Sequence, residues 1–280
     1  MPENSPPESV DAPSVKAADA YHHGDLRAAL IAAAREALET ATPDAITLKS
    51  LAARLGVSQP APYRHFEDRD ALLATVAARG FEDLVARELK RLTDAIPPDD
   101  LAIQWDLAYE TQDLERVLAW TPEGAWERFA GPVTRLTRLI PSPVLVGYHL
   151  CYGTFPEWPM YEARDMALLV RMANFAVANS GRQVDWVHLA GPRYLRSEDR
   201  SFFRPLADLE PGDARVFLGI VLPIDGEAGL RRRHATASRY LPDFGVAMYC
   251  GFGRQPGRDG TETMREHAHV AEVARTLHAG

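Results

Sequence analysis

The sequence predicts a multidomain α and α/β protein, and three observations carry this prediction. Residues 47–66 have the residue pattern of a helix-turn-helix, in which two helices are joined by a tight turn. Beyond residue 98 the pattern changes to short apolar runs that alternate with helical segments, as in a parallel sheet of βαβ units. The length of 280 residues is ample for two domains.

The segment 47–66 (TLKSLAARLGVSQPAPYRHF) predicts its two helices residue by residue. Thr47 suits the first N-cap because its hydroxyl can accept an amide proton of the first turn. Gly56 suits the left-handed position that ends this helix, since glycine has no Cβ to clash. Ser58 can cap a short second helix, and Pro60 is tolerated in its first turn. Helical spacing predicts one buried stripe from Leu48, Leu51, Ala52 and Leu55.

Two further helical patterns flank this motif. The first is amphipathic and ends near Leu38, and the second opens at residues 67–70 with acidic side chains at the positive end of a helix. Taken together, residues 21–92 resemble the DNA-binding domain of TetR-type transcriptional regulators. The resemblance rests on HHGDLRAALIAAA, on LAARLGVSQPAPYRHFEDRDALL and on the long connecting helix that follows. A three-helix domain with a connecting helix is therefore expected over residues 21–95.

The resemblance implies contacts with double-stranded DNA. At the start of the recognition helix the residues that would face the major groove are Ser58, Gln59, Pro60 and Ala61. Of these, Gln59 is the best candidate for reading a base. The residues that would approach phosphates are Thr47, Lys49, Tyr63, His65 and Arg69. Core packing is the alternative for Tyr63 and the expectation for Phe66, while Arg64 fits a solvated helix face. Such a regulator would act as a homodimer, and a small-molecule effector is a further expected partner.

Composition limits the other function classes. The net charge of −8 argues against a protein that coats nucleic acid without specificity, although a local basic patch suffices for a regulator. Two cysteines are too few for a disulfide framework and fit a reducing, cytoplasmic location. No long uncharged apolar run is present, so no membrane partner is expected. Residues 1–20, rich in proline and polar residues, predict a disordered arm.

The second half predicts alternating strands and helices. Strands are expected at residues 102–108, 144–150, 184–190, 215–222 and 244–249. Helices are expected at residues 123–139, 163–179, 226–241 and 261–277. The strand segments are mostly apolar throughout, which is typical of strands buried on both faces of a parallel sheet.

From about residue 101 to residue 280 the chain resembles the later half of the barrel of cobalamin-independent methionine synthases. The resemblance rests on residues 147–152 (GYHLCY), 249–251 (YCG) and 103–106 (IQWD). It implies that residues 96–280 form a partial (β/α) barrel-like domain around the parallel sheet. A complete barrel needs about 250 residues, so five βα units fit here. An open sheet also has exposed edges, through which two copies can associate.

In that family the histidine and both cysteines bind a zinc ion that activates a thiol for methyl transfer. His149 and Cys151, two residues apart on a strand, point to the same face and can reach one metal. Cys250 would approach from the rim of a later strand. Imidazole and thiolate ligands suit zinc. Residues 187–190 lack the family's glutamate, for which His188 is a candidate substitute, and buried cysteines without a metal remain the alternative.

Two functions follow from these patterns. The favoured one is a sequence-specific DNA-binding regulator with an atypical second domain that senses a ligand or joins two copies. The alternative is a zinc-dependent methyltransferase-like enzyme with an accessory DNA-binding domain. The first rests on a complete motif and the second on a shortened scaffold, so we expect a regulator rather than an enzyme and assign no catalytic residue. Whether it represses or activates is left open.

Overall fold

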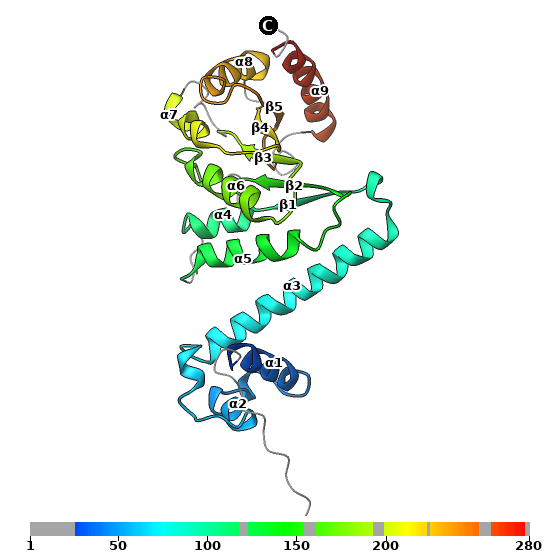
Figure 1. The fold of residues 1–280 in the computed structure, drawn as a ribbon. Coiled ribbons are helices and arrows are strands. Elements are labelled where there is room, and N and C mark those ends of the chain that lie inside the picture. Colours follow the sequence, from blue (N-terminus) through cyan, green and yellow to red (C-terminus); the bar gives the residue numbers. More distant parts are fainter. Residues whose placement is uncertain are drawn as a thin grey trace, which may run out of the picture. The chain divides into compact units, whose positions relative to one another are not determined.

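The computed structural model describes residues 26–117, 123–153, 161–192, 199–222, 225–251 and 259–277. The chain divides into two compact units, one up to Phe81 and one from Glu82 onwards. The helix α3 (Arg69–Ala95) contains the point of division and contributes to both units (Figure 1). The expected disordered arm at residues 1–20 lies outside the described residues. No helix in the described ranges is long and apolar enough to cross a membrane.

The first unit is helical. It contains α1 (Leu26–Leu38), the 3-10 turn η1 (Pro43–Ala45), α2 (Leu48–Arg54), the 3-10 turn η2 (Pro62–Arg64) and the first part of α3. Gly56 has a φ of 66°, the left-handed conformation predicted for the end of α2. Of the apolar stripe predicted for α2, Leu48, Leu51 and Ala52 are buried, and Leu55 is partly buried. The core of this unit consists of Leu26, Leu30, Ala33, Ala34, Ile46, Leu48, Leu51, Phe66, Leu72 and Val76.

The second helix of the motif differs from the prediction. An α-helix was expected after Ser58, but the structure has only the 3-10 turn η2 in this segment. Pro60 and Pro62 are the physical reason, because proline has no backbone N–H and cannot donate the hydrogen bond that an α-helix needs. The backbone instead closes short turns, in which the Ala61 amide donates to the Ser58 carbonyl at 3.0 Å and the Arg64 amide donates to the Ala61 carbonyl at 3.2 Å.

The second unit is an α/β structure around a five-stranded sheet (Figure 1). Its strands are β1 (Ala102–Asp106), β2 (Leu145–Leu150), β3 (Trp186–Ala190), β4 (Arg215–Val221) and β5 (Gly245–Met248). They are all parallel and lie side by side in chain order. Its helices, besides the later part of α3 and η3 (Pro98–Asp100), are α4 (Ala108–Leu114), α5 (Ala125–Thr137), α6 (Ala167–Asn179), α7 (Arg200–Phe203) with η4 (Arg204–Asp208), α8 (Gly226–Ala237) and α9 (Gly260–Leu277).

The parallel sheet and all five strands were predicted, and the structure confirms them. The predicted strands were each one or two residues too long. At β1 the strand ends at Asp106, and α4 already starts at Ala108. The amide of Leu107, between them, still donates to the His149 carbonyl at 2.9 Å. Leu107 and Ala108 are apolar like most of the strand residues before them, so the sequence pattern did not mark the end of β1 at Asp106.

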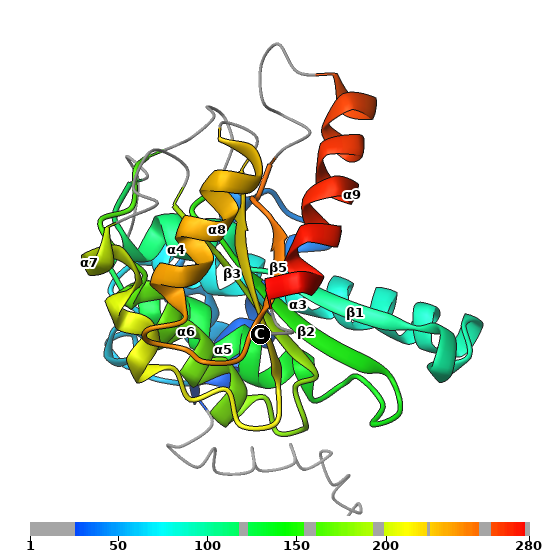
Figure 2. The same cartoon turned by 90° about the horizontal axis from the view of Figure 1, so that it is seen from above.

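The two faces of the sheet have different side chains. One face packs on helices and is apolar, as the buried Val146, Tyr148 and Leu150 of β2 show. The opposite face carries flat aromatic rings. A Cβ added to Gly147 would lie 1.9 Å from Trp186 Cε2, so the indole of β3 covers the backbone of β2. Right-handed crossovers between strands in chain order place the connecting helices on one face of the sheet. Figure 2 shows α4, α6 and α8 on one side of the strands, and these helices pack against β2, β3 and β4.

Buried charge also holds the second unit together. The guanidinium of Arg233 on α8 is fully buried and donates to both carboxylate oxygens of Asp225 at 2.8 Å. Its Nε donates to the Ile220 carbonyl at the end of β4, at 2.7 Å. A second, more exposed ion pair joins two helices: Arg135 of α5 donates to the carboxylate of Glu82 on α3, with Nε to Oε2 at 2.8 Å. These bonds attach α8 to the sheet and α3 to α5.

Replacing Asp225 should strongly destabilise the second unit. In an Asp225→Ala variant Arg233 would keep its charge in a buried place without its carboxylate, which typically costs about 3–5 kcal/mol. The measurement is urea unfolding followed by tryptophan fluorescence, because all five tryptophans lie beyond residue 82. The matched control is Glu227→Ala on the same helix, whose surface pair with Arg231 should contribute under about 1 kcal/mol. Equal losses in the two variants would contradict the account.

Candidate nucleic-acid interface and candidate metal centre

The N-terminus of α2 is capped by Thr47, as the sequence predicted. The Ser50 amide donates to Thr47 Oγ1 at 3.0 Å, and the Thr47 amide donates to Ser50 Oγ at 3.2 Å, which completes a reciprocal capping box. This arrangement fixes the start of α2 and thereby the position of Lys49, an exposed cation in its first turn. The Thr47 hydroxyl is therefore engaged within the helix.

Most of the expected DNA-contacting residues are accessible. Ser58, Gln59 and Pro60 are exposed, and Tyr63 is 58% exposed. This exposure argues against the alternative that Tyr63 is a core residue. Phe66, in contrast, is only 4% exposed and packs in the core as expected. Three expected contacts are partly buried: Ala61, His65 and Arg69.

Arg69 is held by two carboxylates. Its Nε donates to Asp70 Oδ1 at 2.9 Å, and its Nη1 lies 3.5 Å from Asp44 Oδ1. The hydrogen bond that Arg69 donates to Asp70 is the largest cause that raises the pKa of Arg69, followed by the charge of the same carboxylate. A DNA phosphate would have to compete with both acids, so Arg69 offers less attraction than its position in the motif suggests.

Arg64 was expected only to lie on a solvated helix face, not to contact DNA. It is exposed at the end of η2 beside Tyr63, and no ion pair involves it in the part of the chain that the structure describes. The same holds for Lys49. Arg54, by comparison, pairs with Glu36. The signal that could have singled out Arg64 is its place in the run 63–65 (YRH), where a cation stands between two expected phosphate contacts.

A second cluster lies on the face of the sheet opposite the core helices. Asp106, His149 and His188 are register partners on β1, β2 and β3, and therefore form one row across three strands. The Nδ1 atoms of His149 and His188 are 2.8 Å apart. Nε2 of His149 lies 3.7 Å from Asp106 Oδ1. The row stands where the strands reach their carboxyl ends.

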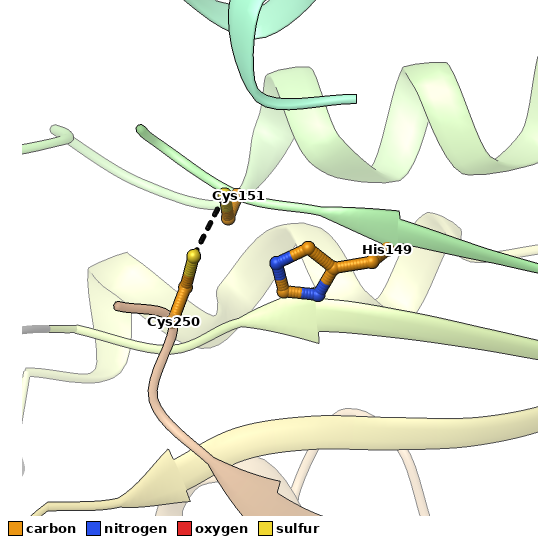
Figure 3. Close-up of side chains that lie close together, drawn as sticks. All are labelled: His149, Cys151 and Cys250. Carbon is orange, nitrogen blue, oxygen red and sulfur yellow. Dashed lines mark hydrogen bonds between the residues drawn. The ribbon is translucent and has the colours of Figure 1, made fainter. Parts of the chain in front are cut away.

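Two thiols complete this cluster (Figure 3). Cys151 follows β2, Cys250 follows β5, and their Sγ atoms are 3.0 Å apart. The ligand atoms of His149, Cys151 and Cys250 all lie within 4.8 Å of one another. In a flat sheet three strand spacings of about 4.8 Å would separate β2 from β5 by roughly 14 Å. The sheet and the segments that follow its strands therefore curve to bring the two cysteines together.

The donor set and its spacing fit zinc. Two thiolates on a tetrahedral zinc ion lie about 3.8 Å apart, since each Zn–S bond is about 2.3 Å. The observed Sγ–Sγ distance of 3.0 Å is within about 1 Å of that value, so small rotations would seat the ion. Within the described ranges no fourth acidic, cysteine or histidine ligand joins the three. Three protein ligands with one open position are typical of catalytic rather than structural zinc sites.

His188 supports His149 instead of joining the ligands. Burial, and then the nearby His149, lower the pKa of His188 to about 3, so its ring is neutral. A proton on His149 Nδ1 satisfies the bond to His188 and leaves the lone pair of His149 Nε2 for a metal. Figure 3 shows one ring nitrogen of His149 directed towards the two sulfur atoms. Sequence reasoning had offered His188 as a substitute ligand, and the structure gives it a different place.

A groove lies on the same sheet face, near the residues at which β2, β3 and β4 begin. It has a volume of about 560 Å³ and is lined by the aromatic rings of Trp186 and Phe217, with Gln104 and Arg215 beside them. Trp186 Nε1 donates to Gln104 Oε1 at 3.4 Å, and the Arg215 guanidinium lies 5.7 Å from the centre of the Phe217 ring. This volume lies in the range of about 300–1,000 Å³ that is typical of small-molecule sites in proteins.

The comparisons with known proteins support the helix-turn-helix motif predicted from the sequence. Residues 30–76 match the family described as bacterial regulatory proteins, tetR family. The chain therefore carries a DNA-binding domain of the TetR type, as its motifs indicated. The comparison with curated proteins found no match.

Among solved structures the chain is similar to a candidate vitamin-B12-independent methionine synthase from Listeria monocytogenes. The identity is 17% and the TM-score is 0.46, with 73% of this chain and 56% of that chain covered. This chain thus spans little more than half the length of that protein.

The partly buried Glu110 on α4 should make stability depend on pH. Burial is the largest cause that raises its pKa, and the carboxylates of Asp113 and Asp106 raise it further. A raised pKa in the folded state contributes stability below the ordinary pKa of 4.5, which is lost as pH rises through the folded value. Glu110→Gln has no such loss. As the pH rises from about 4 to about 7, the free energy of unfolding of Glu110→Gln should therefore increase relative to that of the parent chain at the same pH.

The measurement is urea unfolding of both proteins across this pH range, with the exposed Glu115→Gln of the same segment as control. An unchanged pH dependence in Glu110→Gln would show that this carboxyl is not the source.

Proposed function

We propose that this protein is a sequence-specific DNA-binding transcriptional regulator, whose second unit senses a ligand or a metal or joins two copies. The observation that carries the proposal is the TetR-type helix-turn-helix, matched over residues 30–76, with its polar and cationic side chains exposed. A regulator of this kind works on DNA inside the cell, and the proposal therefore places it in the cytoplasm.

Binding would divide between phosphate and base contacts. Lys49, Tyr63 and Arg64 carry donors suited to phosphate oxygens, which set affinity and orientation but not sequence preference. The Gln59 side chain can both donate and accept, as readout of an adenine edge in the major groove requires. Pro60, exposed beside it, offers an apolar surface suited to a thymine methyl group. Base readout therefore rests on few side chains, and phosphate contacts are expected to supply most of the affinity.

Dimer formation would come from the second unit. The sheet has two edge strands, β1 and β5, and its strand order leaves both without a partner strand in the described residues. Exposed edges pair readily with another chain. Two copies joined there would present two DNA-reading motifs, which suits an operator with two half-sites.

The test is binding to the DNA upstream of the protein's own gene. Fluorescence anisotropy in a salt series should show saturable binding that weakens with salt and exceeds binding to shuffled DNA of equal length. Equal affinity for the natural and the shuffled DNA would contradict sequence-specific regulation.

Three variants separate the expected contacts. Tyr63→Ala should weaken binding to all sequences by about 1 kcal/mol, because a phosphate contact is lost. Gln59→Ala should instead lose discrimination by about 1–3 kcal/mol at one base position. Lys49→Ala should reduce the slope of log affinity against log salt by about one, whereas Lys90→Ala, the same charge change on an exposed residue of α3, should not. Identical effects of Lys49→Ala and Lys90→Ala would remove Lys49 from the interface.

The cluster of His149, Cys151 and Cys250 favours a second candidate function, a zinc-dependent methyltransferase-like activity. The three residues would hold the ion, and His188 would orient the imidazole through the Nδ1 bond. When bound, zinc would hold a substrate thiol as the more nucleophilic thiolate. Asp106, whose Oδ1 lies 3.7 Å from His149 Nε2, borders the same place.

Metal analysis tests this candidate. Protein purified without chelators should contain about one zinc ion per chain, and Cys250→Ser should lose it. His188→Gln should weaken zinc affinity about 10–100-fold, because the orienting partner of His149 is altered. His234→Gln, which changes a histidine on α8, is the matched control and should retain zinc. Absence of stoichiometric zinc in the parent protein would dispose of the metal site.

A further inference from the structure

The cysteine pair has a geometry that metal binding alone does not require. A disulfide has an S–S distance of about 2.05 Å, and the Sγ atoms of Cys151 and Cys250 are already 3.0 Å apart. The two residues are 99 positions apart in the chain and follow strands that are not neighbours in the sheet. Nothing in local chain geometry imposes this proximity, because it depends on the fold of the whole second unit.

We propose that Cys151 and Cys250 form an oxidisable dithiol, which hydrogen peroxide or a similar peroxide converts into an intramolecular disulfide in the metal-free protein. The inference rests on the geometry of the second unit and does not depend on DNA binding. Disulfides in a reducing compartment are typically transient and redox-sensing rather than structural.

The burial of the two cysteines sets the order of the reaction. Cys151 is only 1% exposed, whereas Cys250 is partly accessible. The peroxide therefore meets the sulfur of Cys250, which attacks one peroxide oxygen, breaks the O–O bond and becomes a sulfenic acid as one water leaves. The sulfur of Cys151 then attacks the Cys250 sulfur, the S–S bond forms, and the second water leaves with the thiol proton. Both sulfurs are oxidised, and one peroxide is reduced to two waters.

The product would link distant parts of the second unit. The bond would tie the end of β2 to the end of β5, across the positions of β3 and β4. It would also consume both thiolates that a zinc ion needs, so oxidation and metal binding exclude each other. Reduction by a dithiol restores the original state through thiol–disulfide exchange.

The test uses the full chain, stripped of metal with a chelator and treated with one equivalent of hydrogen peroxide. Mass spectrometry of the intact protein should show the loss of two hydrogens, and peptide mapping should show Cys151 joined to Cys250 within one chain. Dithiothreitol should restore both titratable thiols. Unchanged thiols, or a disulfide only between chains, would overturn the proposal.

Single-cysteine variants test the order of attack. With Cys151→Ser, peroxide should leave a sulfenic acid at Cys250 that a dimedone probe labels. With Cys250→Ser, the buried Cys151 should stay unlabelled under the same conditions. Circular dichroism before treatment establishes that each variant is folded, and urea-unfolded protein supplies the comparison. If unfolded and folded parent chains form the disulfide at the same rate, the native geometry does not promote it, and the proposal fails.

Discussion

The order of the strands is the constraint on which the second unit depends. Five parallel strands that follow one another across the sheet need right-handed crossovers, which place the connecting helices on one face. The side chains on the opposite face then come from the strands themselves. In this chain it presents two flat rings, Trp186 and Phe217, over Gly147 and Gly245. It also presents the row of Asp106 and the two histidines, and the cysteines follow at the strand ends. The sheet order therefore positions the site.

The sequence predicted most of this fold, because hydrophobic periodicity and helix-capping residues are local signals. Thr47 and Gly56 marked the limits of α2, and apolar runs marked all five strands. The failures have local causes as well. Pro60 and Pro62 remove amide donors from the recognition segment, so it forms a 3-10 turn where an α-helix was expected. The end of β1 at Asp106 was missed because the next two residues, Leu107 and Ala108, are apolar and did not mark a boundary.

The sequence predicted less of the candidate metal site than of the fold. Residue spacing placed His149 and Cys151 on one face, and a family resemblance added Cys250. The bond between His149 and His188 and the 3.0 Å between the thiols depend on strand register and on sheet curvature, which no local pattern encodes. The same holds for Arg69. Its carboxylate partner Asp44 is 25 residues away, so only the folded chain shows that this cation is already engaged.

Two chemistries thus occur in one chain, a DNA-reading motif and a histidine–cysteine cluster, with α3 common to both units. The central claim is that the first of these reads sequence. The most direct measurement is selection of bound DNA from a random library by the full chain, with deep sequencing of the selected pool. The account predicts an enriched motif of two inverted half-sites, about one helical turn apart, whose preference weakens in Gln59→Ala. A pool without any enriched motif would contradict it.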